Sequence, residues 1–403
     1  MLSRRADYEP ALDVAAAQPM LAQTLDWAAI NSGTTNLAGL ATIAGKLVDA
    51  FSALPGKIGL RDADPVEAIL PDGAVRPVAR GQNLHLAVRP GAPVQILLTG
   101  HMDTVYAADH AFQAIARLDD GRINGPGVAD MKSGLSIMLA ALTGLETSPL
   151  RDRVGYEVVI NSDEETGSHG SAGLIARAAR GKAAALTYEP SATPDGLLAG
   201  ARPGSGNFSI VVTGRSAHAG RNPEDGRNAI LAAADLALRL AKAAGPRLSV
   251  NPARIEGGSP NNVVPDHAVL RVNLRPSTPE DELRATSHIR SAIAMVAAAH
   301  DVTIHSHGGF ARPPKPLDPA AERLFALVRE CGATLGQTIG WAPSGGVCDG
   351  NNIAAAGVAV VDTMGARGGA IHSADEFLIP ESLAERAMLS TLVLLELAER
   401  GQS

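Results

Sequence analysis

The sequence predicts an α/β protein: a mostly parallel mixed sheet with helices on both faces, and a smaller ferredoxin-like (βαββαβ) unit inserted into it. Two observations carry this prediction. Before residue 200 and again after residue 312, short apolar runs alternate with helix-periodic segments, and several runs end in polar residues. That alternation is typical of parallel strands buried on both faces. Between these two parts the order of elements changes to β-α-β-β-α-β.

The first part of the chain supplies most of the predicted sheet. Helical periodicity covers 20–31, 39–54, 133–145 and 171–180, and strand-like runs cover 65–70, 83–88, 94–98, 155–160 and 183–188. Turn signals such as Pro71-Asp72-Gly73 divide the early strands. The segment 133–145 has small or apolar residues on most sides, so we expect a buried helix.

The inserted unit is marked by its element order and by the loops at its ends. We predict strands at 208–213, 248–255, 268–274 and 302–305, and helices at 228–244 and 279–299. Loops rich in Pro and Gly border the unit. The alternation then resumes with helices at 321–331 and 381–400 and a strand at 353–361. We therefore predict a discontinuous domain of residues 1–202 and 313–403 and an inserted domain of residues 203–312.

Composition excludes several classes of partner. The 403 residues can form two cores, and 45% of them are hydrophobic. The net charge of -7 offers no basic stripe for nucleic acid. Cys331 and Cys348 form no C-x-x-C pair. The apolar run 135–145 is too short to span a bilayer, and the arginines near Met1 precede no apolar stretch. We expect a cytoplasmic protein that binds neither nucleic acid nor membrane.

Histidine and carboxylate residues recur where predicted strands end. They are His101 and Asp103 after 94–98, Glu164 and Glu165 after 155–160, and Glu189 after 183–188, with Asp130 in a glycine-rich turn and His372 in a late loop. Open α/β sheets bind ligands at the carboxyl ends of their strands, so we expect these residues to meet. Two imidazoles and several carboxylates without a thiolate suit zinc, cobalt or manganese.

Each of these residues alone has an ordinary explanation. Asp130 could be only the N-cap of the helix that follows. The pair Glu164 and Glu165 could be a solvated loop, and a single histidine in an H-x-D context is common. Their joint occurrence at the strand ends of one sheet favours a common site.

The motifs resemble those of the zinc-dependent aminoacylase and carboxypeptidase family. That family includes glutamate carboxypeptidase, succinyl-diaminopimelate desuccinylase, acetylornithine deacetylase and peptidase T. The resemblance spans about residues 20 to 400 and rests on six motifs in the family's order: Gly-His101-Met-Asp103-Thr-Val, Gly-Val-Ala-Asp130-Met-Lys-Ser-Gly, Asp-Glu164-Glu165-Thr-Gly-Ser, Tyr-Glu189-Pro, Gly-Arg-Ser-Ala-His218-Ala-Gly and Gly-Gly-Ala-Ile-His372-Ser. Among these members, the texture most resembles that of glutamate (folate-cleaving) carboxypeptidase, through Tyr-Glu189-Pro and the loop Cys348-Asp-Gly-Asn.

The resemblance implies two zinc ions per subunit, with cobalt or manganese as substitutes. Asp130 would bridge the two ions. His101 and Glu189 would complete one site, and Glu165 and His372 the other. Dinuclear sites of this kind hold their ions roughly 3.5–4 Å apart.

The resemblance also implies roles for the residues beside the ligands. Asp103 would fix the orientation of the His101 ring, and Glu164 would be the general base. The peptide bond after Asp130 is expected to be cis.

The inserted domain would then be a lid and a dimerisation domain. His218 would stabilise the oxyanion in the active site of the partner subunit of a homodimer. Asn262 and Arg275 would contact the substrate, Arg275 by a bidentate grip on a free carboxylate. Gly345 and Gly346 would hold a carboxylate through backbone N–H groups.

The expected reaction is hydrolysis of an amide bond that releases a C-terminal, Glu-like amino acid from a small N-acyl or peptidyl substrate. An N-acyl-amino-acid or N-acetylornithine deacylase using the same site is an alternative. A catalytically silent binding protein of the same fold is another, which the presence of every ligand position and of Glu164 disfavours. The family more often has Ser or Thr where Cys348 stands, so the substrate stays open.

Overall fold

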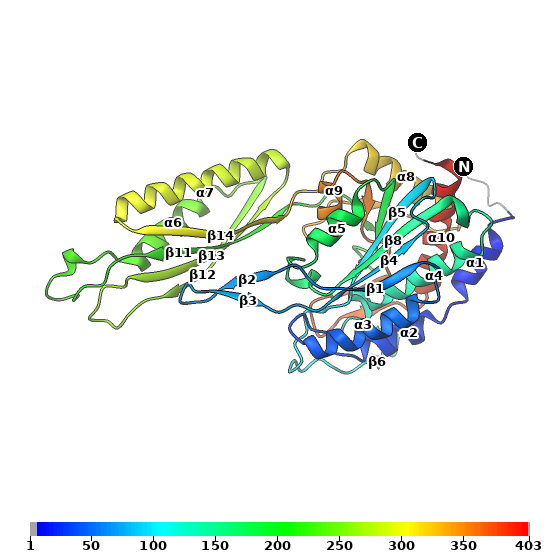
Figure 1. The fold of residues 1–403 in the computed structure, drawn as a ribbon, viewed down its shortest axis with the longest axis horizontal. Coiled ribbons are helices and arrows are strands. Elements are labelled where there is room, and N and C mark those ends of the chain that lie inside the picture. The colour runs from blue at the N-terminus through cyan, green and yellow to red at the C-terminus, as the bar shows by residue number, and fades with distance from the viewer. Residues whose placement is uncertain (1–5, 402–403) are drawn as a thin grey trace.

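The structure is a computed structural model that describes residues 6–401, so the arginines at positions 4 and 5 lie outside the described residues. The chain forms two bodies, a larger one around a six-stranded sheet and a smaller one around a four-stranded sheet (Figure 1). The predicted fold class is confirmed. The predicted domain limits stay a prediction.

The six-stranded sheet positions the predicted site. Its order is β1 (Lys57–Arg61), β4 (Asn83–Val88), β8 (Val154–Asn161), β5 (Val94–His101), β9 (Ala184–Thr187) and β16 (Val360–Val361). From β8 to β16 neighbouring strands are parallel, whereas β1 and β4 are antiparallel to their neighbours. The carboxyl ends of four strands therefore share one edge.

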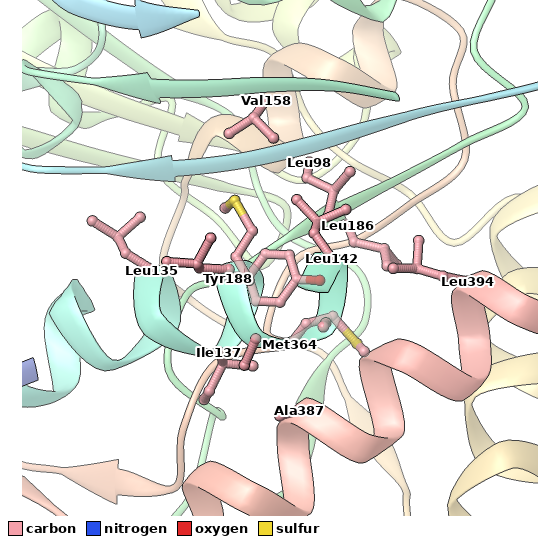
Figure 2. Close-up of a cluster of buried hydrophobic side chains, with 14 of the residues drawn as sticks. Leu98, Leu135, Ile137, Leu142, Val158, Leu186, Tyr188, Met364, Ala387 and Leu394 are labelled. Atoms are coloured by element: carbon pink, nitrogen blue, oxygen red, sulfur yellow. The ribbon is translucent and has the colours of Figure 1, made fainter. Parts of the chain in front are cut away.

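Helices cover both faces of this sheet because side chains alternate along each strand. Leu98 and Val158 face a core that includes α4 (Ser133–Thr147) and α10 (Ser382–Arg400), whereas Leu97 and Val159 face α5 (Ala172–Ala179) and α9 (Asp349–Ala355). Helix α4 lies between the sheet and α10 (Figure 2). The remaining helices of this body are α1 (Glu9–Ala16), α2 (Met20–Ala28), α3 (Leu37–Phe51) and α8 (Pro319–Thr334).

One helical segment, Val128–Thr147, has the length and hydropathy of a membrane span. Within the described residues, 94% of its apolar window is buried inside the protein. Its position between the sheet and α10 accounts for the apolar composition that the sequence displays on most sides of this helix.

The smaller body is the four-stranded sheet with two helices on one face (Figure 1). Its order is β12 (Leu248–Gly257), β13 (His267–Pro276), β11 (Ser205–Thr213) and β14 (Thr303–Arg312), and every pair is antiparallel. Helices α6 (Ala229–Ala241) and α7 (Pro279–His300) supply its separate core. Along the chain these elements follow the predicted β-α-β-β-α-β order.

The secondary structure differs from the sequence predictions in several places; α1 and β1, for example, lie where no element was predicted. The strand predicted at 353–361 is strand only at β16, because Cys348 and Asn351 cap the helix α9 that occupies the first part. The run at 65–70 forms a hairpin, β2 (Val66–Ile69) with β3 (Val75–Val78), outside the main sheet. This hairpin reaches the inserted sheet, where Arg271 donates to the carbonyl of Ile69 at 2.7 Å (Figure 1).

Short strands complete the molecule near the site. One small sheet has the order β17 (Gly368–Gly369), β18 (Phe377–Leu378), β7 (Ile123–Asn124) and β6 (Ala116–Arg117). Strand β10 (Leu198–Ala199) pairs with β15 (Trp341–Ala342). The loop between β17 and β18 carries His372.

Candidate metal centre

Three neighbouring parallel strands deliver predicted ligands to one edge of the sheet. His101 is the last residue of β5, Glu165 lies in the short turn after β8, and Glu189 follows β9 by two residues. Strand β5 pairs with both β8 and β9. The chain therefore leaves the sheet at adjacent points, and the side chains that follow the strands meet.

Asp130 lies in the turn before α4, and its peptide bond to Met131 is cis, as the resemblance implied. The buried carboxylate of Glu376 accepts hydrogen bonds from the N–H groups of Ala129 and Asp130, each at 3.0 Å. Sequence reasoning missed Glu376. The available signal was its position four residues after His372 in the same loop.

The ligand atoms are arranged around the two oxygens of Asp130. His101 Nε2 lies 3.1 Å from Asp130 Oδ1 and 3.7 Å from Glu189 Oε2. His372 Nε2 lies 3.3 Å from Asp130 Oδ2 and 3.2 Å from Glu165 Oε2. Asp130 thus divides the cluster into two halves, each with one histidine and one further carboxylate.

The cluster fits divalent cations. Glu189 Oε1 is buried without a hydrogen-bond partner among the described residues, and buried polar atoms normally have one. Burial, together with the charge of Asp130, raises the pKa of Glu165 to about 7. The cluster therefore places the carboxylates of Asp130, Glu165 and Glu189 beside two imidazoles. That donor set matches the oxygen and nitrogen ligands of zinc, cobalt or manganese.

Asp103 aligns both neighbouring segments, and it is fully buried. Its Oδ1 accepts from the N–H of Glu164 and its Oδ2 from the N–H of Glu165, both at 3.2 Å. The hydroxyl of Thr34 also donates to Oδ2, at 2.7 Å. His101 Nδ1 lies 3.3 Å from Oδ1. One carboxylate therefore fixes the His101 ring relative to the turn after β8.

Glu164 lies beside this cluster. Burial raises the pKa of Glu164 well above its usual value, and the Arg312 guanidinium, 2.7 Å from Oε1, opposes that shift. Arg312 was not predicted, and no pattern in the sequence around it pointed to such a contact.

A cavity of about 490 Å³ opens beside the cluster. Its walls include the carboxylates of the cluster and His372, and among its further lining residues are Pro190, Ala192, Pro194, Arg202, Ser344, Gly346, Cys348, Ile371 and Phe377. This size suits a small-molecule ligand. The half-exposed His372, with 53% of its side chain accessible, connects the cluster to the opening.

Cys348 has a structural position in this wall. Its buried sulfur accepts from the N–H of Gly350 at 3.3 Å and lies 3.5 Å from Asp362 Oδ2, to which its S–H donates. Burial raises the pKa of the Cys348 thiol well above its usual value. The thiol is therefore neutral and caps helix α9.

The predicted substrate-binding residues lie in two different places. Arg275 Nη1 donates to the carbonyl of Gly345 at 3.1 Å, so this arginine reaches the glycine-rich loop. His218 and Asn262 are exposed and near each other, since Ala219 N–H donates to the Asn262 carbonyl at 3.0 Å. Neither His218 nor Asn262 lines the cavity.

Comparison with known proteins gives a family match over most of the chain. The model described as Peptidase family M20/M25/M40 matches residues 97–396. Carboxypeptidase G2 from Pseudomonas sp. (strain RS-16) is 29% identical over 326 residues, which cover 79% of this chain and 77% of that protein. Succinyl-diaminopimelate desuccinylase from Psychrobacter arcticus is 27% identical over 322 residues, which cover 74% of this chain and 77% of that protein.

Solved structures share the fold. A tripeptidase from Staphylococcus aureus superimposes with a TM-score of 0.72 at 23% identity, covering 94% of this chain and 98% of that chain. A dinuclear metal-binding peptidase from Bacillus subtilis gives a TM-score of 0.61 at 16% identity, covering 93% of this chain and 97% of that chain. At these identities the likeness concerns the fold alone.

Proposed function

We propose that this chain, which belongs to peptidase family M20/M25/M40, is a dinuclear zinc enzyme that hydrolyses an amide bond. The family predicted from the motifs is confirmed, and so is the enzyme class, a metallo-hydrolase. The observation that carries the finer proposal is the position of Asp130, whose two oxygens face different histidines.

The proposed ligands follow from that arrangement. Asp130 would be shared by two zinc ions, with His101 and Glu189 as the further ligands of one and Glu165 and His372 as those of the other. Cobalt or manganese offers similar coordination to this ligand set. Bound ions of this kind lower the pKa of water and polarise a carbonyl group.

The remaining steps belong to side chains of the protein. Glu164 accepts the proton of the attacking water and passes it to the leaving nitrogen. Asp103 keeps the His101 ring in one orientation while this happens. Because water attacks directly, no covalent link to the enzyme is needed.

For the substrate, we propose a small N-acyl or peptidyl compound that releases a Glu-like C-terminal amino acid. The contact between Arg275 and Gly345 supports this, since it brings a guanidinium to the loop whose Gly346 lines the cavity. A guanidinium in that position suits a free carboxylate. The desuccinylase relatives favour a second candidate, a deacylase of N-acyl amino acids at the same site.

The exposure of His218 and Asn262 supports a homodimer formed through the inserted domain. In that proposal each histidine stabilises the oxyanion in the partner subunit's cavity, because it lies outside the cavity of its own chain. A cytoplasmic location stays a prediction.

A substrate panel tests these proposals. The zinc-loaded protein would be given folate, N-acyl-glutamates, N-acetylornithine, N-succinyl amino acids and dipeptides, and its bound metal measured separately. We expect N-acyl-glutamates to be hydrolysed fastest. Preference for acetyl or succinyl compounds would favour the deacylase. No hydrolysis with two zinc ions bound would favour the silent binding protein.

A further inference from the structure

The two segments that join the sheets carry three buried cations. Arg202 precedes β11, Arg312 ends β14, and Lys315 follows it; their side chains are 7%, 7% and 4% exposed. Arg202 and Lys315 both bind Asp362, at 2.8 and 2.9 Å. Arg312 instead lies 2.7 Å from Glu164 Oε1. A buried charge without a partner destabilises the fold, so each of these cations needs the carboxylate that it contacts.

Arg312 contacts both the backbone carbonyl and the side-chain carboxylate of Glu164. Its Nη2 donates to the backbone carbonyl of Glu164 at 2.8 Å and faces the side-chain Oε1. The same nitrogen lies 3.0 Å from the hydroxyl of Ser168 and 3.7 Å from Asp349 Oδ1. The carboxylate and the turn that carries it are therefore fixed by one guanidinium.

The segment that carries Arg312 is itself fixed to the larger body. The side chain of Asn351, on α9, donates to the carbonyls of Pro203 and Pro313 at 2.9 and 2.8 Å. Asn352 donates to the carbonyl of Ala311 at 3.0 Å. Both joining segments are thus pinned beside Glu164, and Arg312 approaches it from a defined backbone position.

The contact leaves Glu164 with one free oxygen. No N–H or O–H group of residues 6–401 donates to Oε2. Glu164 also lies so close to His101 and Glu189 that one ligand atom from each falls within 4.8 Å of the others. Without Arg312 to hold it, a carboxylate at that distance can rotate and bind a metal ion itself.

We propose that Arg312 is a positioning residue: by binding Glu164 Oε1 it keeps this carboxylate out of the metal ligand set and available for proton transfer. The inference rests on the proposed function. Both contacts come from Nη2, and the planar guanidinium fixes where that nitrogen lies, so a lysine ammonium should keep only part of the effect.

Cobalt binding tests the proposal without any substrate. The Co²⁺-loaded wild type would be compared with Arg312→Met, Arg312→Lys, Glu164→Gln and the double variant Arg312→Met/Glu164→Gln by visible absorption and by metal titration. In Arg312→Met the released Glu164 becomes a ligand, so the Co²⁺ spectrum changes and the dissociation constant falls. In the double variant the spectrum equals that of Glu164→Gln. The spectrum and the dissociation constant of Arg312→Lys lie between those of the wild type and Arg312→Met.

A matched control separates this effect from the loss of a buried arginine. Arg386 is 1% exposed and donates to the carbonyl of Gly196, outside the cavity. Arg386→Met removes an equally buried guanidinium and leaves the Co²⁺ spectrum unchanged. Thermal unfolding of each variant shows that the chain is folded when its spectrum is recorded.

Kinetics with any substrate found give a second readout. Arg312→Met lowers kcat by about 10- to 100-fold, with little change in KM, because it acts through the base. The same change in the Glu164→Gln background causes no further loss. An unchanged cobalt spectrum in folded Arg312→Met, loss of metal instead of added ligation, or an equal loss of kcat in both backgrounds would overturn the proposal. If wild type hydrolyses nothing, the proposed function fails while the cobalt comparison still decides the role of Arg312.

Discussion

The carboxyl edge of the six-stranded sheet and the tip of the inserted sheet contribute to the proposed site in different ways. At the sheet edge, ligand atoms from five segments lie within contact distance of one another, and most are buried. At the tip, His218 and Asn262 are exposed and lie outside the cavity. A single chain therefore assembles the proposed metal site, whereas His218 and Asn262 do not reach the cavity of their own chain.

The difference has a physical origin. Pairing of β5 with β8 and β9 fixes where those strands end. Asp103 and Glu376 accept backbone hydrogen bonds that fix the turn after β8 and the turn of Asp130. The segments of His218 and Asn262 are held mainly by each other. Substitutions at the sheet edge should therefore alter catalysis and metal binding. The effects of substitutions at the tip should depend on the formation of the homodimer.

The largest effect is expected at Glu164. Replacing Glu164 by Ala removes the proposed base, so kcat should fall by about 10²- to 10⁴-fold while both metal ions stay bound. Metal content and steady-state kinetics check this. Glu157→Gln, on strand β8 but paired with His85 and Lys182, is the control and should keep its activity. Activity that survives in Glu164→Ala would contradict the assignment.

The next effect distinguishes the two regions most sharply. His218→Ala should lower kcat by about 10²- to 10³-fold, as loss of an oxyanion donor does, without loss of metal. Co-expressed with Glu164→Ala, it should form mixed dimers that regain activity above either parent, because one cavity then has both residues. Sedimentation would show the dimer. A fully active monomer would exclude a shared site.

A smaller effect is expected at Glu376, which connects the loop of His372 to the loop of Asp130 by hydrogen bonds. Glu376→Gln weakens the hydrogen bonds to Ala129 and Asp130, so zinc affinity should fall by about 10- to 100-fold. Competition with a chelator measures this. Asp375→Asn changes the exposed neighbouring carboxylate and should leave affinity unaltered. Equal affinities in the two variants would show that Glu376 does not order the site.

The smallest effect is expected at Arg275. Lysine keeps the charge but loses the bidentate grip, so Arg275→Lys should raise KM by about tenfold with kcat less affected. Initial rates across substrate concentrations check this. Arg254→Lys, an exposed arginine on β12, serves as the control. A change in kcat alone would place Arg275 outside carboxylate recognition.

The sequence predicted the features that depend on strand order. Apolar runs followed by His101, Glu165 and Glu189 indicated parallel strands with polar ends, and the structure brings these residues together with Asp130 and His372. It also predicted the order of the inserted elements. The roles proposed for the site residues stay predictions.

The features it missed depend on contacts between distant loops. Glu376 acts on backbone N–H groups of another loop, Thr34 reaches Asp103 from before α3, and Arg312 reaches Glu164 from the end of β14. None has a periodic pattern or a spacing that identifies its partner. Helix α9 was missed because the cap formed by Cys348 is not a common one.

The position of the metal ions tests the central claim most directly. Anomalous diffraction from crystals of the zinc-loaded protein would locate each ion. We predict two peaks roughly 3.5–4 Å apart, the usual spacing of a dinuclear site. One should lie between Asp130 Oδ1, His101 and Glu189, and the other between Asp130 Oδ2, Glu165 and His372. A single ion, or ions bound without Asp130 between them, would contradict the account.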